Sequence, residues 1–119
     1  MADFDEEKQN KQLDEIHKEE EEQLVEVLAR SKYGLPYANL HRLGIDNEAL
    51  RSISEADARA LKIAPFKLSG KNIFIAVRSP SPELMERLKQ DMERQSLVPT
   101  FYMTSIASLE KVWERYLEL

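Results

Sequence analysis

Five consecutive apolar residues, Ile73 to Val77, most constrain how this 119-residue chain folds. The run is rich in β-branched residues and too short for a buried helix, so it predicts a strand covered on both faces. Ser69-Gly70-Lys71 precedes it and predicts a hairpin turn from an edge strand, in which Pro65 is tolerated. Pro80 and Pro82 follow at positions where a helix can begin.

Further elements are expected on both sides of this strand. Apolar residues recur at helical spacing over 84–92 and 106–117, and Ser54 is placed to cap a short helix over 55–61. Asp46 is expected to cap a short turn before it. Residues 98–103 predict a third strand, which is parallel to the central strand because a helix connects the two. The expected fold class is α+β: a small three-stranded mixed sheet in the order β-β-α-β-α, with packed helices and an N-terminal helix.

The N-terminal helix has a clear stop signal. Gly34 stands where a left-handed residue ends a helix, and Pro36 follows shortly after it. A firm helix is therefore expected from about Glu20 to Tyr33. Its apolar residues predict one stripe, interrupted by the glutamates of 19–22, and the members of that stripe are Leu13, Ile16, Leu24, Val27 and Leu28.

Charge separates an acidic arm from a nearly balanced remainder. Residues 1–30 hold eleven acids against four bases, a net charge of −7, whereas residues 31–119 hold 11 acids and 13 bases, a net charge of +2. Such a run is typical of a solvated tail or an exposed helix face, and a docking arm for a basic partner is the alternative. We expect residues 1–19 to form a disordered or frayed arm and residues 20–119 to form one domain.

Catalytic and metal-binding patterns are not found in the sequence. The chain has no cysteine, and neither His17 nor His41 has another histidine nearby, as a metal site usually requires. The segment 69–72 lacks the first glycine and the hydroxyl residue of a phosphate loop. The aromatic residues of the predicted strands follow no RNA-binding signature. We expect no enzyme activity, no cofactor, no metal and no nucleic-acid partner.

An ordered set of short segments runs through residues 24–117. In chain order they are Tyr33–Leu40 (YGLPYANL), Ile45–Ile53 (IDNEALRSI), Ala58, Ile63–Phe66 (IAPF), Ala76–Pro80 (AVRSP) and Tyr116. In order and spacing they resemble the N-terminal domain of type II secretion and type IV pilus assembly ATPases. Ser79 departs from the acid or amide that this family usually has before the proline, but both residue types cap helices.

The resemblance implies a non-catalytic role. In that family the domain precedes a hexameric ATPase motor and docks it on the cytoplasmic part of an inner-membrane assembly-platform protein. The expected partners are therefore such a cytoplasmic domain and an ATPase motor in the full-length chain. No apolar run reaches the length of a membrane span, so we expect a cytoplasmic protein, peripheral to the inner membrane through a partner and not inserted in it. Whether the chain is a fragment of a larger ATPase or free-standing stays open.

Two alternative surfaces follow from these observations. The first is a docking surface on the apolar positions of the N-terminal helix, namely Leu24, Val27, Leu28 and Tyr33. The second belongs to a regulatory module that holds an anionic nucleotide ligand near Arg42, Arg51 and Arg59. Some members of the resembled family bind cyclic di-GMP through two tandem motifs, of which Arg42-Leu43-Gly44 is a single incomplete match, so the resemblance does not carry that ligand to this chain.

Deleting residues 1–12 should leave the thermal midpoint within a few degrees of the full chain. Phe4 is the large apolar residue of this stretch, and it offers little area to offset the roughly 1–2 kcal/mol per residue that ordering the backbone costs. Thermal unfolding followed by circular dichroism measures the midpoint. A loss of cooperative unfolding after the deletion would show that the arm packs on the domain.

Overall fold

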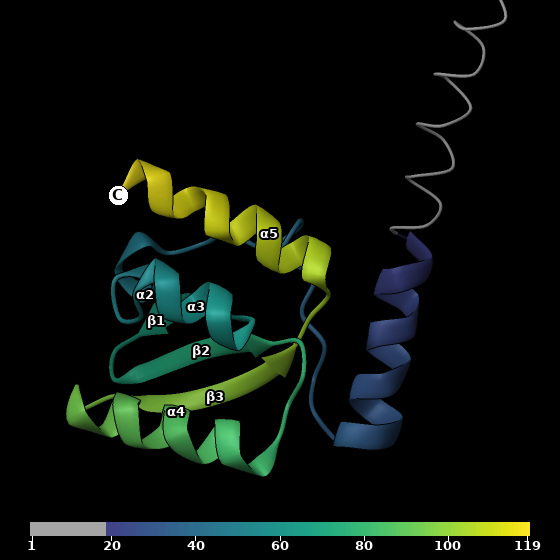
Figure 1. Ribbon diagram of the computed structural model, residues 1–119, viewed down its shortest axis with the longest axis horizontal. Helices are drawn as coiled ribbons and strands as arrows, with labels where there is room; N and C mark the ends of the chain where they lie inside the picture. Colours follow the sequence, from purple (N-terminus) through teal and green to yellow (C-terminus); the bar gives the residue numbers. More distant parts are fainter. Residues whose placement is uncertain (1–18) are drawn as a thin grey trace, which may run out of the picture.

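A three-stranded sheet lies at the centre of the computed structural model, which describes residues 19–119 (Figure 1). Strand β1 (Ile63–Ser69) is antiparallel to β2 (Asn72–Val77), and β2 is parallel to β3 (Val98–Met103). The strands follow in the order β1-β2-β3, so the apolar run occupies the central strand, as the sequence predicts. Because parallel strands need a crossover, α4 (Pro82–Arg94) connects β2 to β3.

The remaining elements surround this sheet. A helix covers residues 19–28 and continues in a π-helical turn, η1 (Ala29–Tyr33); we call residues 19–33 the N-terminal helix. Two short helices, α2 (Asn47–Leu50) and α3 (Glu55–Leu61), precede β1, and α5 (Ile106–Glu114) with η2 (Arg115–Glu118) follows β3. In Figure 1, α2, α3 and α5 lie on the β1 side and α4 on the β3 side, while the N-terminal helix stands at one end. The expected α+β class is confirmed.

Serine side chains begin three of the helices. Ser54, Ser81 and Ser105 each accept a hydrogen bond from the backbone N–H three residues later, which satisfies an amide that the helix leaves free. Gly70 has φ +61° in the hairpin turn between β1 and β2, a conformation that favours glycine. The sequence interpretation of 69–71 as a hairpin is therefore confirmed.

Asp46 has a different role from the predicted one. It stands at the position before α2, but its side chain makes no capping bond there. Its Oδ2 instead accepts the backbone N–H of Leu68 at 3.1 Å, and its own N–H donates to the carbonyl of Phe66 at 2.9 Å. Asp46 thus satisfies the outer edge of β1, and the capping role was wrong because the edge amide of a strand competes for the same carboxylate.

The apolar interior has two separate parts. The main core joins the sheet to α3, α4 and α5 and contains Ile75, Leu88 and Trp113, whose indole N–H donates to the carbonyl of Ile63 at 2.9 Å. A second, smaller cluster consists of buried Val25, Ala29 and Met103, with partly buried neighbours. The N-terminal helix therefore packs through its own small cluster and is not part of the main core.

The residues of the predicted apolar stripe lie on more than one face of the N-terminal helix. Val25 and Ala29 are fully buried, whereas Leu24 and Val27 are 56% and 60% exposed. The stripe positions Leu13 and Ile16 lie outside the described residues. The pattern did not reveal the buried face for a physical reason: Ala29 is too small to mark it, and this face also includes the polar residue Glu22.

Replacing Asp46 by serine should destabilise the domain as much as replacing it by alanine. A serine caps a helix about as well as an aspartate, but its shorter side chain does not reach the N–H of Leu68. Each variant should lower the free energy of unfolding by about 1 kcal/mol, the usual loss for one hydrogen bond. Urea unfolding measures this, and a serine variant as stable as the parent would restore the capping role.

Candidate functional site

A polar cluster around Glu22 joins the N-terminal helix to the sheet domain. The Glu22 side chain is 15% exposed, although the sequence analysis placed the glutamates of 19–22 on a solvated face. Its carboxylate accepts hydrogen bonds from the hydroxyls of Tyr37, Ser105 and Ser108, the last at 3.0 Å. A mostly buried carboxylate is costly unless it is hydrogen-bonded, and these three donors meet that requirement.

The two serines of the cluster are themselves oriented by backbone groups. Ser105 Oγ accepts the N–H of Ser108 at 3.0 Å as the cap of α5, and Ser108 Oγ accepts the N–H of Leu40 at 3.3 Å. Both residues are fully buried. Each serine oxygen accepts one backbone N–H, and the single proton of each hydroxyl is donated to Glu22.

Backbone pairing at the end of β3 places Tyr37 beside the serines. The N–H of Met103 donates to the carbonyl of Pro36 at 2.8 Å, and the N–H of Ala38 donates to the carbonyl of Met103 at 2.9 Å. The segment 36–38 therefore runs parallel to the end of β3. The hydroxyl of Thr104 adds a bond to the carbonyl of Ala38 at 2.8 Å.

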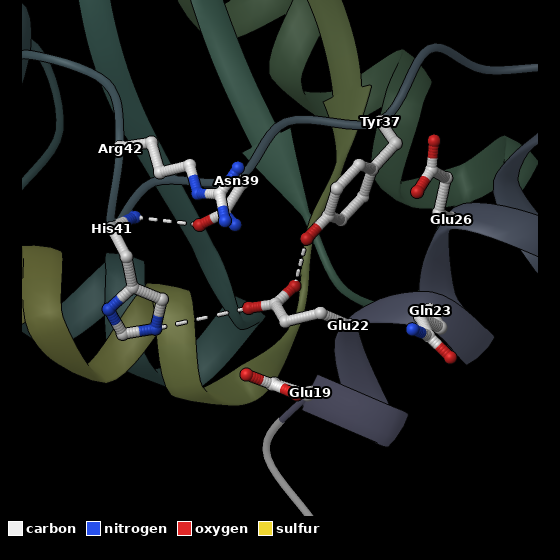
Figure 2. A pocket seen from close by; sticks show the side chains of 8 residues that line it. All are labelled: Glu19, Glu22, Gln23, Glu26, Tyr37, Asn39, His41 and Arg42. Carbon is white, nitrogen blue, oxygen red and sulfur yellow. Dashed lines mark hydrogen bonds and ion pairs between the residues drawn. The ribbon is translucent and has the colours of Figure 1, made fainter. Parts of the chain in front are cut away.

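A groove of about 630 Å³ lies between the N-terminal helix and the segment 37–42 (Figure 2). Figure 2 shows Glu22 between Tyr37 and His41, whose Nε2 is 3.9 Å from the Glu22 carboxylate. Burial is the largest cause that raises the pKa of Tyr37 above its ordinary value, followed by its bond to Glu22. The residues that line the groove are Glu19, Glu22, Gln23, Glu26, Tyr37, Asn39, His41 and Arg42.

A second groove, of about 580 Å³, has an aromatic floor. Phe66, Phe74 and Tyr102 lie with ring centroids 5.5–6.2 Å apart, and the Nζ of Lys67 lies 5.6 Å from the Phe74 centroid. Leu43, which is 47% exposed, lies at its side. Phe66 is buried, so these aromatics stabilise the sheet as well as line its surface.

The four predicted docking residues fall into two groups. Leu24 and Val27 are exposed, one helical turn apart. Leu28 and Tyr33 are partly buried against the small cluster of Val25, Ala29 and Met103. The predicted docking surface therefore divides into two residues that face solvent and two that also support the packing of the helix.

The three predicted anion-binding arginines have different surroundings. Arg42 lines the groove beside Glu22. Arg51 is exposed at the end of α2. Arg59 forms an ion pair with Glu55 at 3.1 Å and lies over the Trp113 ring, 5.4 Å from its centroid. None of the four grooves described for this domain is lined by two of these arginines.

Two further properties concern the described part of the chain. Within residues 19–119, no set of three or more histidine, aspartate or glutamate side chains is arranged to hold a metal ion. Over the same residues, no helix combines the length and the apolar character that a membrane span requires.

Sequence reasoning missed Glu22, Ser105 and Ser108 as site residues. The spacing of Glu22, Val25 and Ala29 is that of one helix face, which is a signal in principle. A glutamate beside three other glutamates nevertheless suggests a solvated side chain, and the two serine hydroxyls that bind it lie more than 80 positions away. A contact at that separation is visible only after the chain has folded.

Comparison with known proteins gives one matching family and several solved structures of similar fold. The model of the MshEN domain matches residues 33–118. A solved structure described as MshE with cdg, the abbreviation for cyclic di-GMP, is 26% identical, with a TM-score of 0.68 over 79% of this chain and 66% of that chain. No curated protein matches this chain.

Two solved structures of the N-terminal domain of XpsE share the fold. Their identities are 14% and 13%, with TM-scores of 0.61 and 0.58 over 76% and 70% of this chain. This chain covers 62% and 58% of those chains. It therefore spans less than two thirds of the length of the three solved chains named here.

The hydroxyl of Tyr37 should ionise only at unusually high pH. Folding raises the pKa of Tyr37, so the protonated hydroxyl stabilises the folded state. This stabilisation is fully present below about pH 10, the ordinary pKa of tyrosine, and it is lost as the pH rises through the raised pKa. Burial likewise raises the pKa of Tyr116 to about 12. Absorbance titration at the tyrosinate band should lose one late-ionising component in Tyr37→Phe, and loss of an early component instead would contradict the buried contact.

Proposed function

The chain belongs to the MshEN domain family, found at the N-terminus of type II secretion and type IV pilus ATPases, and we propose that it is a non-catalytic docking domain. In this proposal it couples an ATPase motor, present in the full-length chain, to the cytoplasmic domain of an inner-membrane platform protein. The protein is then held at the membrane periphery through that partner.

The observation that carries the proposal is the outer face of the N-terminal helix. The inner face is occupied, because Val25 and Ala29 are buried and Glu22 is hydrogen-bonded. Leu24 and Val27 are a second pair of apolar residues on this helix, and their side chains are exposed to solvent. A surface helix of a globular domain usually has one apolar face, and a helix that is apolar on both sides is usually covered on both. A partner protein would supply the second cover.

The charges around this face favour a basic partner. Glu19 and Glu20 are exposed on the same helix, so they would act at the rim of an interface. Rim charges act mainly on the rate of association and on its salt dependence, whereas apolar anchors in the interface act on dissociation. Glu22 is not one of these rim charges, because its carboxylate is hydrogen-bonded within the domain.

A regulatory role with an anionic nucleotide ligand is the second candidate. The similar structure of MshE with cdg favours it, since that protein was solved with a cyclic dinucleotide. Arg42, Arg51 and Arg59 would be the cations in this chain. The ion pair of Arg59 with Glu55 would then have to compete with the ligand.

Leu24→Ala and Val27→Ala should each raise the dissociation rate from a platform-protein cytoplasmic domain about tenfold, without unfolding this domain. Gln23→Ala is the matched control, since Gln23 is exposed on the same helix and is not apolar. Glu19→Gln with Glu20→Gln should instead slow association at low salt and have less effect at high salt. Surface-bound kinetics measures both rates.

Titration of ¹⁵N-labelled protein separates the two candidates. The docking surface predicts amide shift changes on the N-terminal helix when the platform domain is added. Changes confined to residues 42–59, with the helix unaffected, would contradict the docking surface and favour the nucleotide module. Addition of cyclic di-GMP alone tests that second candidate directly.

A further inference from the structure

Within residues 19–119, two attachments hold the N-terminal helix against the rest of the domain. One is the small cluster, to which the helix contributes Val25 and Ala29 as its buried residues. The other is the carboxylate of Glu22 with its three hydroxyl donors. The main core contains no residue of 19–33, so loss of these attachments leaves the packing of the sheet, α3, α4 and α5 in place. The helix is therefore an element that can open separately.

The Glu22 attachment is stronger than a surface ion pair. Each hydroxyl is neutral and donates a hydrogen bond to a carboxylate, which makes the bonds charge-assisted. Ser105 and Ser108 are buried and already receive backbone N–H bonds, so the Glu22 carboxylate is what accepts their protons. Without it, two buried hydroxyl protons lose their acceptor, a loss that an exposed glutamate on the same helix does not cause.

The chain has a hinge where this helix ends. Gly34 has φ +62° and ψ +28°, the left-handed conformation that glycine adopts without strain. The N–H groups of Gly34 and Leu35 both converge on the carbonyl of Ala29 across the π-helical turn. A residue with this freedom, next to a widened helical turn, absorbs a change in backbone direction with little cost.

From these observations we infer that the N-terminal helix is a latch, closed by the Glu22 carboxylate and opening about Gly34 while the sheet stays folded. Opening uncovers Val25 and Ala29 on the helix and Met103 on the domain. The released helix then presents apolar residues on both faces. The inference goes beyond docking, because it concerns the chain by itself and holds whichever partner is bound.

Charged groups of two segments line the groove beside Glu22, and a third element, α5, contacts one of these segments. Glu19 and Glu26 lie on its own helix and repel its charge, while His41 and Arg42 approach from the segment 37–42. From α5, the Nζ of Lys111 contacts the carbonyl of His41 at 3.3 Å. The nearest of these groups is His41, at 3.9 Å from the carboxylate. The polar attachment thus depends on one carboxylate, and within the described residues no other side chain of the helix forms an ion pair with the rest of the domain.

Amide hydrogen exchange on the full chain tests the latch. Glu22→Ala should speed exchange of the amides of residues 26–33 about tenfold or more, while the amides of β2 keep their parent rates. Alanine is the best helix former, so a faster exchange does not come from a lower helix propensity. Tyr37→Phe, which removes one donor and leaves the carboxylate, should give a smaller rise confined to the same amides.

Glu19→Ala is the matched control, because Glu19 is exposed on the same helix and lines the same groove. It makes the same change of charge and should leave the exchange of residues 26–33 near the parent rate. Equal effects of the two alanine variants would overturn the latch. An equal rise in the exchange of β2, or a Glu22→Ala chain that does not fold, would also overturn it, since either result means that helix and sheet open as one unit.

Discussion

The parallel pairing of β2 with β3 is the constraint on which the rest of this structure depends. Parallel neighbours need a crossover, which α4 supplies, and their carboxyl ends then lie at the same edge of the sheet. At that edge the chain leaves β3 at Met103, turns into the buried Thr104 and Ser105, and begins α5. The seat of the N-terminal helix is built from these residues, so the sheet topology fixes where the helix can bind.

The N-terminal helix combines two requirements that conflict in an isolated domain. Its inner face must pack against Met103, while Leu24 and Val27 on its outer face remain exposed to water. An apolar seat large enough to hold the helix firmly would need larger residues than Val25 and Ala29. A small seat with one charge-assisted polar contact gives a specific position with little buried area, which keeps the cost of separation low.

The sheet could be predicted from the sequence because its signals are local. The apolar run of Ile73–Val77, the glycine turn before it and the prolines after it lie within about a dozen residues of each other, and each acts through backbone conformation. The helix ends could be predicted for the same reason. The site could not, because Glu22 meets Ser105 and Ser108 across more than 80 positions. Asp46 shows the same limit, since its partner Leu68 lies 22 positions away.

A mostly buried carboxylate suits a helix that is held and can also be released. Apolar contacts stabilise the closed helix in nearly any orientation. Glu22 stabilises it only when three hydroxyls donate hydrogen bonds to its two oxygens. Once the helix moves by a few tenths of a nanometre, the bonds are lost together and water replaces them, because a solvated carboxylate is stable by itself. The closed and open positions are therefore two distinct states with little between them. This gives a helix position that is well defined when closed and accessible when open.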